Sequence, residues 1–110
     1  MIMADYSIRL EPGQKLGSTP NMLFDYLKGN GIPVNRSEGS SPQPNLIEWY
    51  KFSGHGVVIT AQETGDRGQR FLVGTIELQP DAAVSNATIE DAIRKFAQGP
   101  NAEPARFVGG

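Results

Sequence analysis

The sequence lacks cysteine altogether and contains a single histidine. Without cysteine the chain can form no disulfide, no thiolate nucleophile and none of the tetrahedral zinc sites that use sulfur ligands. One histidine among scattered acidic residues provides no recognisable cluster of metal ligands, and neither calcium-loop nor P-loop spacing occurs. We therefore expect no metal and no cofactor. The lack of cysteine modestly favours a reducing compartment such as the cytoplasm.

Long apolar runs are missing too, as is an excess of either charge. The chain has no run of about eighteen apolar residues, and its start, MIMADYSIRL, has no apolar segment of signal-peptide length. Ten Lys and Arg face twelve Asp and Glu, which gives a net charge of −2. Phosphate-rich partners gain little from that balance. These features predict a soluble cytoplasmic protein that binds no membrane and is not built for nucleic acid.

The residues that are present indicate one domain of the α+β class over residues 1–99. The chain's 38% hydrophobic and 20% charged residues are typical of a globular protein of 110 residues. Alternation of Tyr6, Ile8 and Leu10 with polar residues predicts a first strand over 5–12.

Two helices are predicted on either side of a group of strands. The segment STPNMLFDYLKGNG, residues 18–31, has Thr19 as a capping side chain and glycines at its end. Its buried stripe is expected to consist of Met22, Leu23, Tyr26 and Leu27. The segment TIEDAIRKFAQG, residues 88–99, has Thr88 as its expected cap, with Asp91 reaching back to it.

Three strand-like runs lie between the helices, over residues 46–52, 57–64 and 69–78. Each run is rich in β-branched or aromatic residues, and the connections SGHG and GDRG are short enough for antiparallel hairpins. The expected order is strand, helix, three-stranded antiparallel meander, helix, with both helices packed on one face of the sheet. We expect residues 35–45 to form an exposed loop and residues 100–110 to form a flexible C-terminal tail.

Strand pairing predicts which side chains lie on the face opposite the helices. Pairing Phe52 with Val57 fixes the first hairpin, because antiparallel partners keep a constant sum of residue numbers. The helix-facing side is expected to carry Leu46, Tyr50, Phe52, Val57, Ile59, Ala61, Phe71 and Val73. The candidate protein-binding residues on the opposite side are Trp49, Lys51, Val58, Thr60, Arg70 and Leu72. Trp and Arg are favoured at binding hot spots, so Trp49 and Arg70 lead this set. The alternatives are that another segment covers this face, or that a register slip of one residue inverts it.

The single histidine, His55, lies between two glycines in the SGHG turn, where its imidazole is expected to point to water. A general base needs an orienting carboxylate and a nucleophile within hydrogen-bonding reach, and no triad spacing surrounds it. The strand glutamates Glu48, Glu63 and Glu77 are typical of solvated residues that protect sheet edges. We expect no catalytic residue, and a small enzyme that uses His55 is the weakest of three hypotheses.

From Thr19 to Gly99, the order helix, three antiparallel strands, helix is similar in layout to the double-stranded RNA-binding domain, including a Gly-His element in the first hairpin. The resemblance implies binding of RNA phosphates by lysines at the start of the second helix. Here that position reads TIED, and Arg94 and Lys95 follow a turn or more later. A degenerate nucleic-acid-binding domain is therefore the alternative hypothesis.

The primary hypothesis is a small, acidic, non-enzymatic protein-interaction module. Inhibitors, immunity proteins, chaperones and adaptors all fit this description. Such a module docks a sheet face or a strand edge onto another protein. A homodimer through the face that carries Trp49 satisfies the same pattern.

Overall fold

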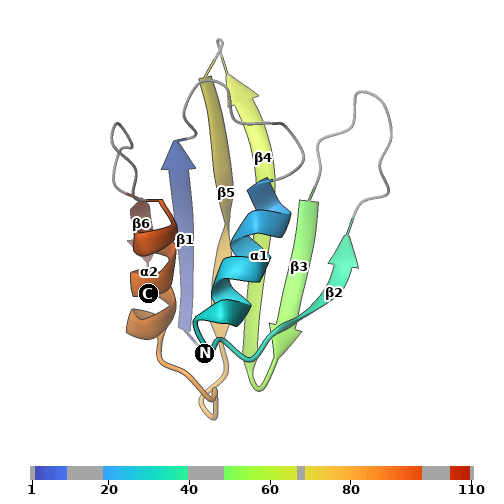
Figure 1. The fold of residues 1–110 in the computed structure, drawn as a ribbon. Coiled ribbons are helices and arrows are strands. Elements are labelled where there is room, and N and C mark those ends of the chain that lie inside the picture. The colour runs from blue at the N-terminus through green and yellow to red at the C-terminus, as the bar shows by residue number, and fades with distance from the viewer. Residues whose placement is uncertain (1, 10–18, 40–48, 67–68, 98–104, 110) are drawn as a thin grey trace.

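The computed structural model describes residues 2–9, 19–39, 49–66, 69–97 and 105–109. In these segments, six strands form one antiparallel sheet in the order β2-β3-β4-β5-β1-β6 (Figure 1). The elements are β1 (Ile2–Arg9), α1 (Thr19–Gly29), β2 (Asn35–Gly39), β3 (Trp49–Gly54), β4 (Val57–Asp66), β5 (Gln69–Leu78), α2 (Asn86–Phe96) and β6 (Arg106–Gly109). The α+β class and the antiparallel sheet are confirmed, but the sheet has two strands more than the sequence indicated.

Strand β1 lies inside the sheet, between β5 and β6, and pairs with β5 along its whole length. Ala4, Tyr6 and Ile8 are buried while their neighbours are more exposed. That alternation is typical of a strand with one buried face. The strand expected over 5–12 therefore begins earlier, at the second residue, and residues 10–12 lie outside the described segments.

Both edges of the sheet come from segments that were expected to be irregular. The expected loop over 35–45 begins with β2, which pairs with β3 through a bulge between Arg36 and Glu38; residues 40–45 lie outside the described part. All five side chains of β2 are exposed, so no apolar alternation marks this strand. The expected tail over 100–110 contains β6, which pairs with β1 and has only four residues in which to show a period.

The Arg36 side chain of β2 contacts other side chains on the helix side of the sheet. Its guanidinium carbon lies 5.3 Å from the ring centre of Phe24 and 4.8 Å from that of Tyr50. The same group donates a hydrogen bond to the side-chain oxygen of Asn21. Exposed cation–π contacts are worth about 0.5–1 kcal/mol each. Through these contacts β2 packs against α1 and β3, although the strand has no apolar side chain.

Helix α1 buries Leu23 and Leu27 completely, as predicted, whereas Met22 is 50% exposed. The helix ends in a Schellman motif, in which the N–H of Ile32 donates to the carbonyl oxygen of Leu27 at 3.1 Å. Gly31 adopts φ +84° there, a conformation that favours glycine.

Helix α2 is capped three residues earlier than predicted. The hydroxyl of Ser85, not that of Thr88, is the capping group, and it accepts the Thr88 N–H at 3.2 Å. Ile89, Ala92 and Ile93 are buried, as the apolar period predicts. Ser85 and Thr88 are both good capping residues, and the apolar period starts only after the second one, so the sequence pointed to the wrong member of the pair.

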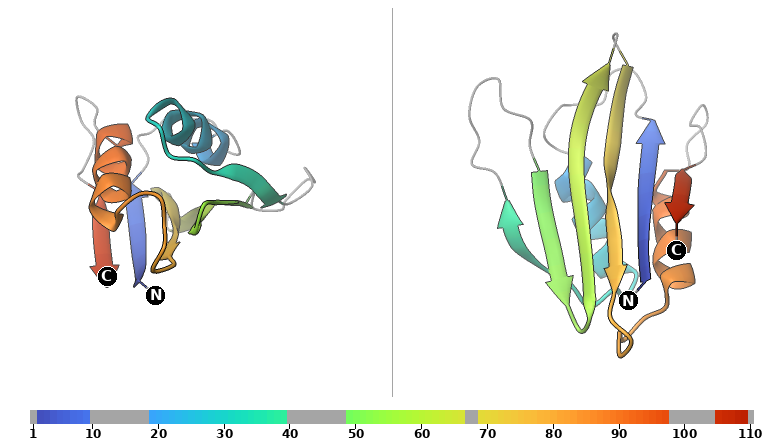
Figure 2. Two further views of the ribbon diagram at one scale, coloured as in Figure 1. Left: turned by 90° about the horizontal axis from the view of Figure 1, so that it is seen from below. Right: turned by 180° about the vertical axis from the view of Figure 1, so that it is seen from behind.

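Both helices lie on the same side of the sheet (Figure 2). One hydrophobic core fills the space between them and the strands. Its largest fully buried side chains include Phe52, Ile59, Leu72 and Ile76 from the sheet and Leu23, Leu27, Ile89 and Ile93 from the helices. Phe24 of α1 packs on Phe52, with ring centres 4.8 Å apart. In the part of the chain that the structure describes, the opposite face of the sheet carries no helix.

Candidate protein-binding face

The sheet face opposite α1 and α2, which we call the open face, is formed by every second residue of each strand. Strand pairing arranges its side chains in cross-strand rows. Three of these rows are Ser53, Val58, Glu77 and Met3; then Glu38, Lys51, Thr60, Thr75, Asp5 and Val108; then Trp49, Gln62, Val73, Ser7 and Arg106. Apolar, hydroxyl and charged side chains are mixed in every part of this face.

Four of the six candidate binding residues lie on the open face: Trp49, Lys51, Val58 and Thr60. Trp49 is 39% exposed, and the other three are half-buried. The expected position of Leu72 is wrong, because this residue is fully buried in the core on the helix side. Arg70 lies on the same strand, two residues before Leu72. The Arg70 side chain lies outside the described part.

The register between β4 and β5 explains this correction. Asp66 pairs with Gln69, so the two strands are joined by a two-residue turn and every pair has an odd sum. Odd-numbered core residues of β4 therefore face even-numbered residues of β5, such as the buried Ile76. Phe71 and Val73, which were expected in the core, lie on the open face as a result.

An open hollow of about 490 Å³ lies at the centre of the open face. Trp49 and Gln62 line one side, Asp5 lines the other, and Thr60 and Thr75 lie between them. Trp49 and Thr60 were among the candidate binding residues, whereas Gln62, Asp5 and Thr75 were not. The available signal for Asp5 was its alternation with buried neighbours on β1.

The hollow lies where backbone pairing between β4 and β5 is interrupted, opposite Thr60 and Ala61 on one strand and Gly74 and Thr75 on the other. Side chains replace the missing ladder contacts. The Thr75 N–H donates to the Thr60 hydroxyl oxygen at 2.8 Å, and the phenol of Tyr6 donates to the Thr60 carbonyl oxygen at 2.6 Å. At this interruption the carbonyl of Thr60 on β4 accepts a hydrogen bond from Tyr6 on β1, although β5 lies between these two strands.

Gly74 makes this arrangement possible. A Cβ at this position would lie 1.8 Å from the carbonyl oxygen of Thr60 and 2.7 Å from the hydroxyl of Tyr6. Tyr6 is 3% exposed, and burial raises the pKa of its phenol far above the usual range. The phenol therefore remains a neutral hydrogen-bond donor.

His55 forms the tip of the β3–β4 hairpin. Gly54 pairs with Val57, which leaves His55 and Gly56 as central residues with φ +52° and +79°. Two positive values identify a type I′ turn, which matches the right-handed twist of the strands. His55 is exposed, as predicted. The hairpin register differs by two residues from the expected one, and a shift of two leaves the faces unchanged.

The strand glutamates do not converge. Glu48 lies outside the described residues. Glu63 is 2% exposed on the helix side of β4, whereas Glu77 is half-buried on the open face. Since these two carboxylates lie on opposite faces of the sheet, they cannot flank one cleft as a hydrolytic pair would.

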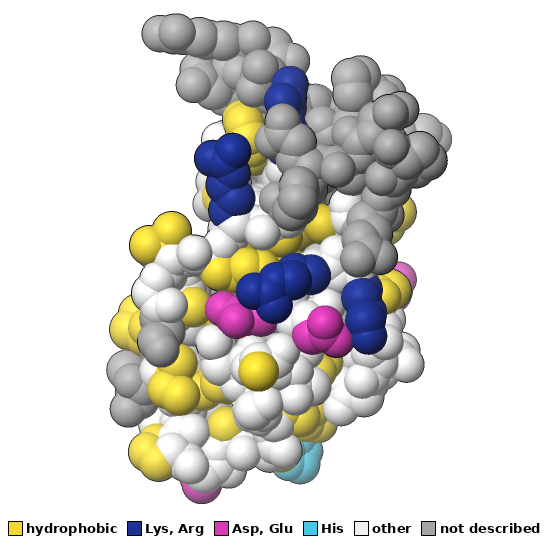
Figure 3. Space-filling view, turned by 90° about the vertical axis from the view of Figure 1, so that its left-hand side faces the viewer, with side chains coloured by type: hydrophobic (Ala, Val, Ile, Leu, Met, Phe, Trp, Pro, Cys, Tyr) yellow, Lys and Arg dark blue, Asp and Glu magenta, His cyan; other side chains and the backbone are white. Residues whose placement is uncertain are grey.

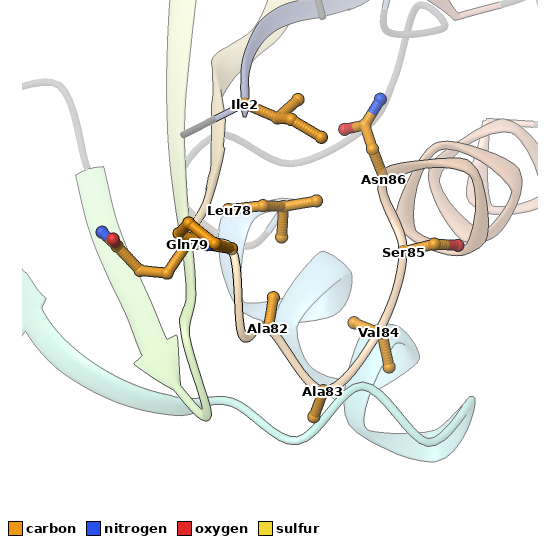
Figure 4. Close-up of a pocket in the computed structure, with 9 residues that line it drawn as sticks. Ile2, Leu78, Gln79, Ala82, Ala83, Val84, Ser85 and Asn86 are labelled. Atoms are coloured by element: carbon orange, nitrogen blue, oxygen red, sulfur yellow. The ribbon is translucent and has the colours of Figure 1, made fainter.

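A second hollow, of about 500 Å³, lies beside the segment that leads from β5 into α2 (Figure 4). Ile2, Leu78 and Val84 supply apolar lining. The Oδ1 atom of Asn86 is buried there, and among the described residues it has no hydrogen-bond partner. No local sequence pattern indicates this hollow, because its walls come from a connection and from one end of the sheet.

The basic residues of α2 lie at its C-terminal end, where Arg94 is 3.9 Å from Glu90 and Lys95 is 3.0 Å from Asp91. The hydrogen bond that the Lys95 ammonium donates to the Asp91 carboxylate raises the pKa of Lys95. Figure 3 shows basic side chains adjacent to acidic ones on this side of the molecule. The first turn of α2 contains Asn, Ala and Thr, so the helix start holds no lysine cluster of the kind that the resemblance to RNA-binding domains implies.

No group of three His, Asp or Glu side chains that could hold a metal ion occurs in the described segments. None of the helices in those segments is long and apolar enough to cross a membrane. Comparison with protein-family models, with curated proteins and with solved structures gives no match to this chain.

Proposed function

We propose that this chain is a non-enzymatic protein-interaction module that docks its open face onto another protein. The observation that supports the proposal is the position of both helices on one side of a six-stranded sheet (Figure 2). Trp49 lies beside a central hollow on the other side. Aromatic side chains next to half-buried apolar groups, with charged residues around them, are the usual composition of a protein interface.

The shape of the open face favours a protein over a small molecule. Trp49, Val58 and Val73 are spread over three neighbouring strands and do not surround one deep pocket. Small-molecule sites bury about 70–90% of their ligand in a cleft. A broad face with a shallow hollow is better suited to a partner of comparable breadth.

Trp49→Ala tests the proposal, with Met22→Ala as the matched control. Met22 is 50% exposed but lies on α1, on the other side of the sheet. After circular dichroism confirms folding, both variants and the wild type are immobilised and exposed to extract from the native host. We expect Trp49→Ala to weaken partner binding about thirtyfold, a typical hot-spot loss, while Met22→Ala retains it. Equal recovery by all three proteins would contradict the proposal.

A salt titration against duplex RNA and DNA separates this proposal from a nucleic-acid function. Phosphate binding by Lys and Arg weakens steeply as salt concentration rises, because bound counterions are released on association. We expect no such binding. Binding to RNA or DNA that weakens steeply with salt, and that is lost when basic residues are substituted, would contradict the protein-binding proposal and favour a nucleic-acid function.

A further inference from the structure

We infer that the occupant of the open face is a second copy of this chain, packed face to face about a two-fold axis that runs parallel to the strands between β4 and β5. The inference rests on the proposed function, because it names the protein that the open face binds. Closed two-fold dimers are the commonest soluble assemblies. The distribution of charge on the open face supports this particular dimer.

Lys51 and Asp5 lie at the same level of the sheet on either side of its centre. Lys51 pairs with Thr60, and Asp5 pairs with Thr75. The two threonine hydroxyls are 2.9 Å apart, so all four residues share one cross-strand row. Strands β3 and β1, which carry the charges, flank β4 and β5 symmetrically. Within the part of the chain that the structure describes, neither Lys51 nor Asp5 forms an ion pair.

Only one of the two aligned two-fold arrangements satisfies these charges. An axis parallel to the strands lays β3 of one copy over β1 of the other, so each Lys51 faces an Asp5. An axis across the strands lays each strand over its own copy, so Lys51 faces Lys51 and Asp5 faces Asp5. Like charges brought together in an interface cost several kcal/mol. The charge pattern therefore selects the first arrangement, with two ion pairs per dimer.

The sizes of the side chains fit the same arrangement. In the row next to the charges, Trp49 of one copy lies over Ser7 of the other, and in the row on the opposite side Met3 lies over Ser53. At these two positions a large side chain faces a small one. Sheets that pack face to face are about 10 Å apart and tilted by about 30°, with interdigitating side chains. Lysine and aspartate side chains together can span that gap.

The area of the open face is close to that of a stable interface. Six strands about 4.8 Å apart, with the longest about 30 Å, give roughly 700 Å² per copy. A standard interface uses about 800 Å² on each partner. At the rim, the same rotation lays Glu38 of one copy over Val108 of the other, next to Arg106. The rim therefore adds opposite charges of its own.

Charge reversal combined with sedimentation equilibrium tests the dimer. The wild type should be dimeric. Lys51→Asp and Asp5→Lys should each raise the dissociation constant of the dimer about tenfold or more, because each places like charges in both symmetry-related pairs. The double variant, with the two charges exchanged, should restore the wild-type constant within about threefold. Lys28→Asp and Asp25→Lys on α1 change the net charge equally and should leave dimerisation unchanged.

The possible results separate this inference from the proposed function. A wild type that is monomeric at every concentration overturns the dimer, while the Trp49→Ala capture experiment still decides the proposed function. A dimer that neither reversal weakens, or that the charge exchange does not restore, overturns the Lys51–Asp5 pairing. Circular dichroism of each variant ensures that a lost dimer is not a lost fold.

Discussion

Among single residues, Gly74 is the one that we expect to tolerate substitution least. The nearest atom to an added Cβ is the carbonyl oxygen of Thr60, a backbone atom that cannot rotate away. Overpacking costs about 1–3 kcal/mol and sometimes more. We expect Gly74→Ala to lower the free energy of unfolding by about 3 kcal/mol, measured by urea denaturation. Gly29→Ala is the control, because no atom lies within 4 Å of its added Cβ; equal losses in both variants would contradict the interpretation.

Tyr6 should make the fold sensitive to alkaline pH. Burial raises the pKa of its phenol, whereas the unfolded chain releases this proton near pH 10. The folded state then holds more protons than the unfolded state, so its stability is constant up to about pH 10 and falls above it. This group alone contributes a fall of about 1.4 kcal/mol per pH unit.

The comparison of wild type with Tyr6→Phe isolates this effect. Near neutral pH the variant should be less stable by about 1 kcal/mol, because the part-buried Thr60 carbonyl loses its donor. Above about pH 10 the stability of the variant should fall less steeply than that of the wild type. Urea denaturation at a series of pH values measures both. Parallel profiles for the two proteins would show that Tyr6 is not the titrating group.

At the scale of elements, the cap of α2 gives a clear prediction. Ser85→Ala removes the hydroxyl that accepts the Thr88 N–H. Loss of such a cap costs about 1 kcal/mol, so the thermal midpoint should fall by a few degrees. Thr88→Ala leaves the capping atom in place and should cost less. A larger loss in Thr88→Ala than in Ser85→Ala would indicate that Thr88 is the cap, as the sequence predicted.

Elements with a clear apolar period were predictable, and elements without one were not. The helices and strands β3 and β4 have such periods. In β5, Phe71, Leu72 and Val73 are three consecutive apolar residues, so both faces of the strand look equally suited to the core. Only the length of the preceding turn decides between them. Strand β2 has no apolar side chain at all, and its position depends on contacts from Arg36 to rings on other elements.

At the scale of the whole molecule, β6 protects the edge of β1. A chain truncated after residue 104 would leave the eight-residue β1 with unpaired backbone groups along one side. Long unprotected edges promote association, so light scattering should show species larger than a dimer. Val108→Lys in the full chain removes an exposed apolar side chain but keeps the strand, and it should not aggregate. If the truncated chain were as soluble as the wild type, β6 would not protect the edge of β1.

The candidate site was only partly predictable, because part of it depends on which distant strands pair in the whole molecule. Trp49, Lys51 and Thr60 belong to one hairpin, whose alternation is visible in the local sequence. Asp5 joins them only because β1 lies beside β5, and Asp5 and Thr75 are far apart in the chain. Local patterns do not encode such pairings, so the sequence identified the correct hairpin of the binding face but only part of the residues that line its hollow.

The bond from Tyr6 to Thr60 has a consequence for the order in which the chain folds. The two residues are 54 positions apart, and the bond crosses β5 to reach β4. The β4–β5 hairpin can form locally, but the Thr60 carbonyl receives its donor only when β1 arrives. Contacts between distant residues form late, because loop closure must precede them. We therefore expect β1 to complete the centre of the sheet after the β4–β5 hairpin has formed.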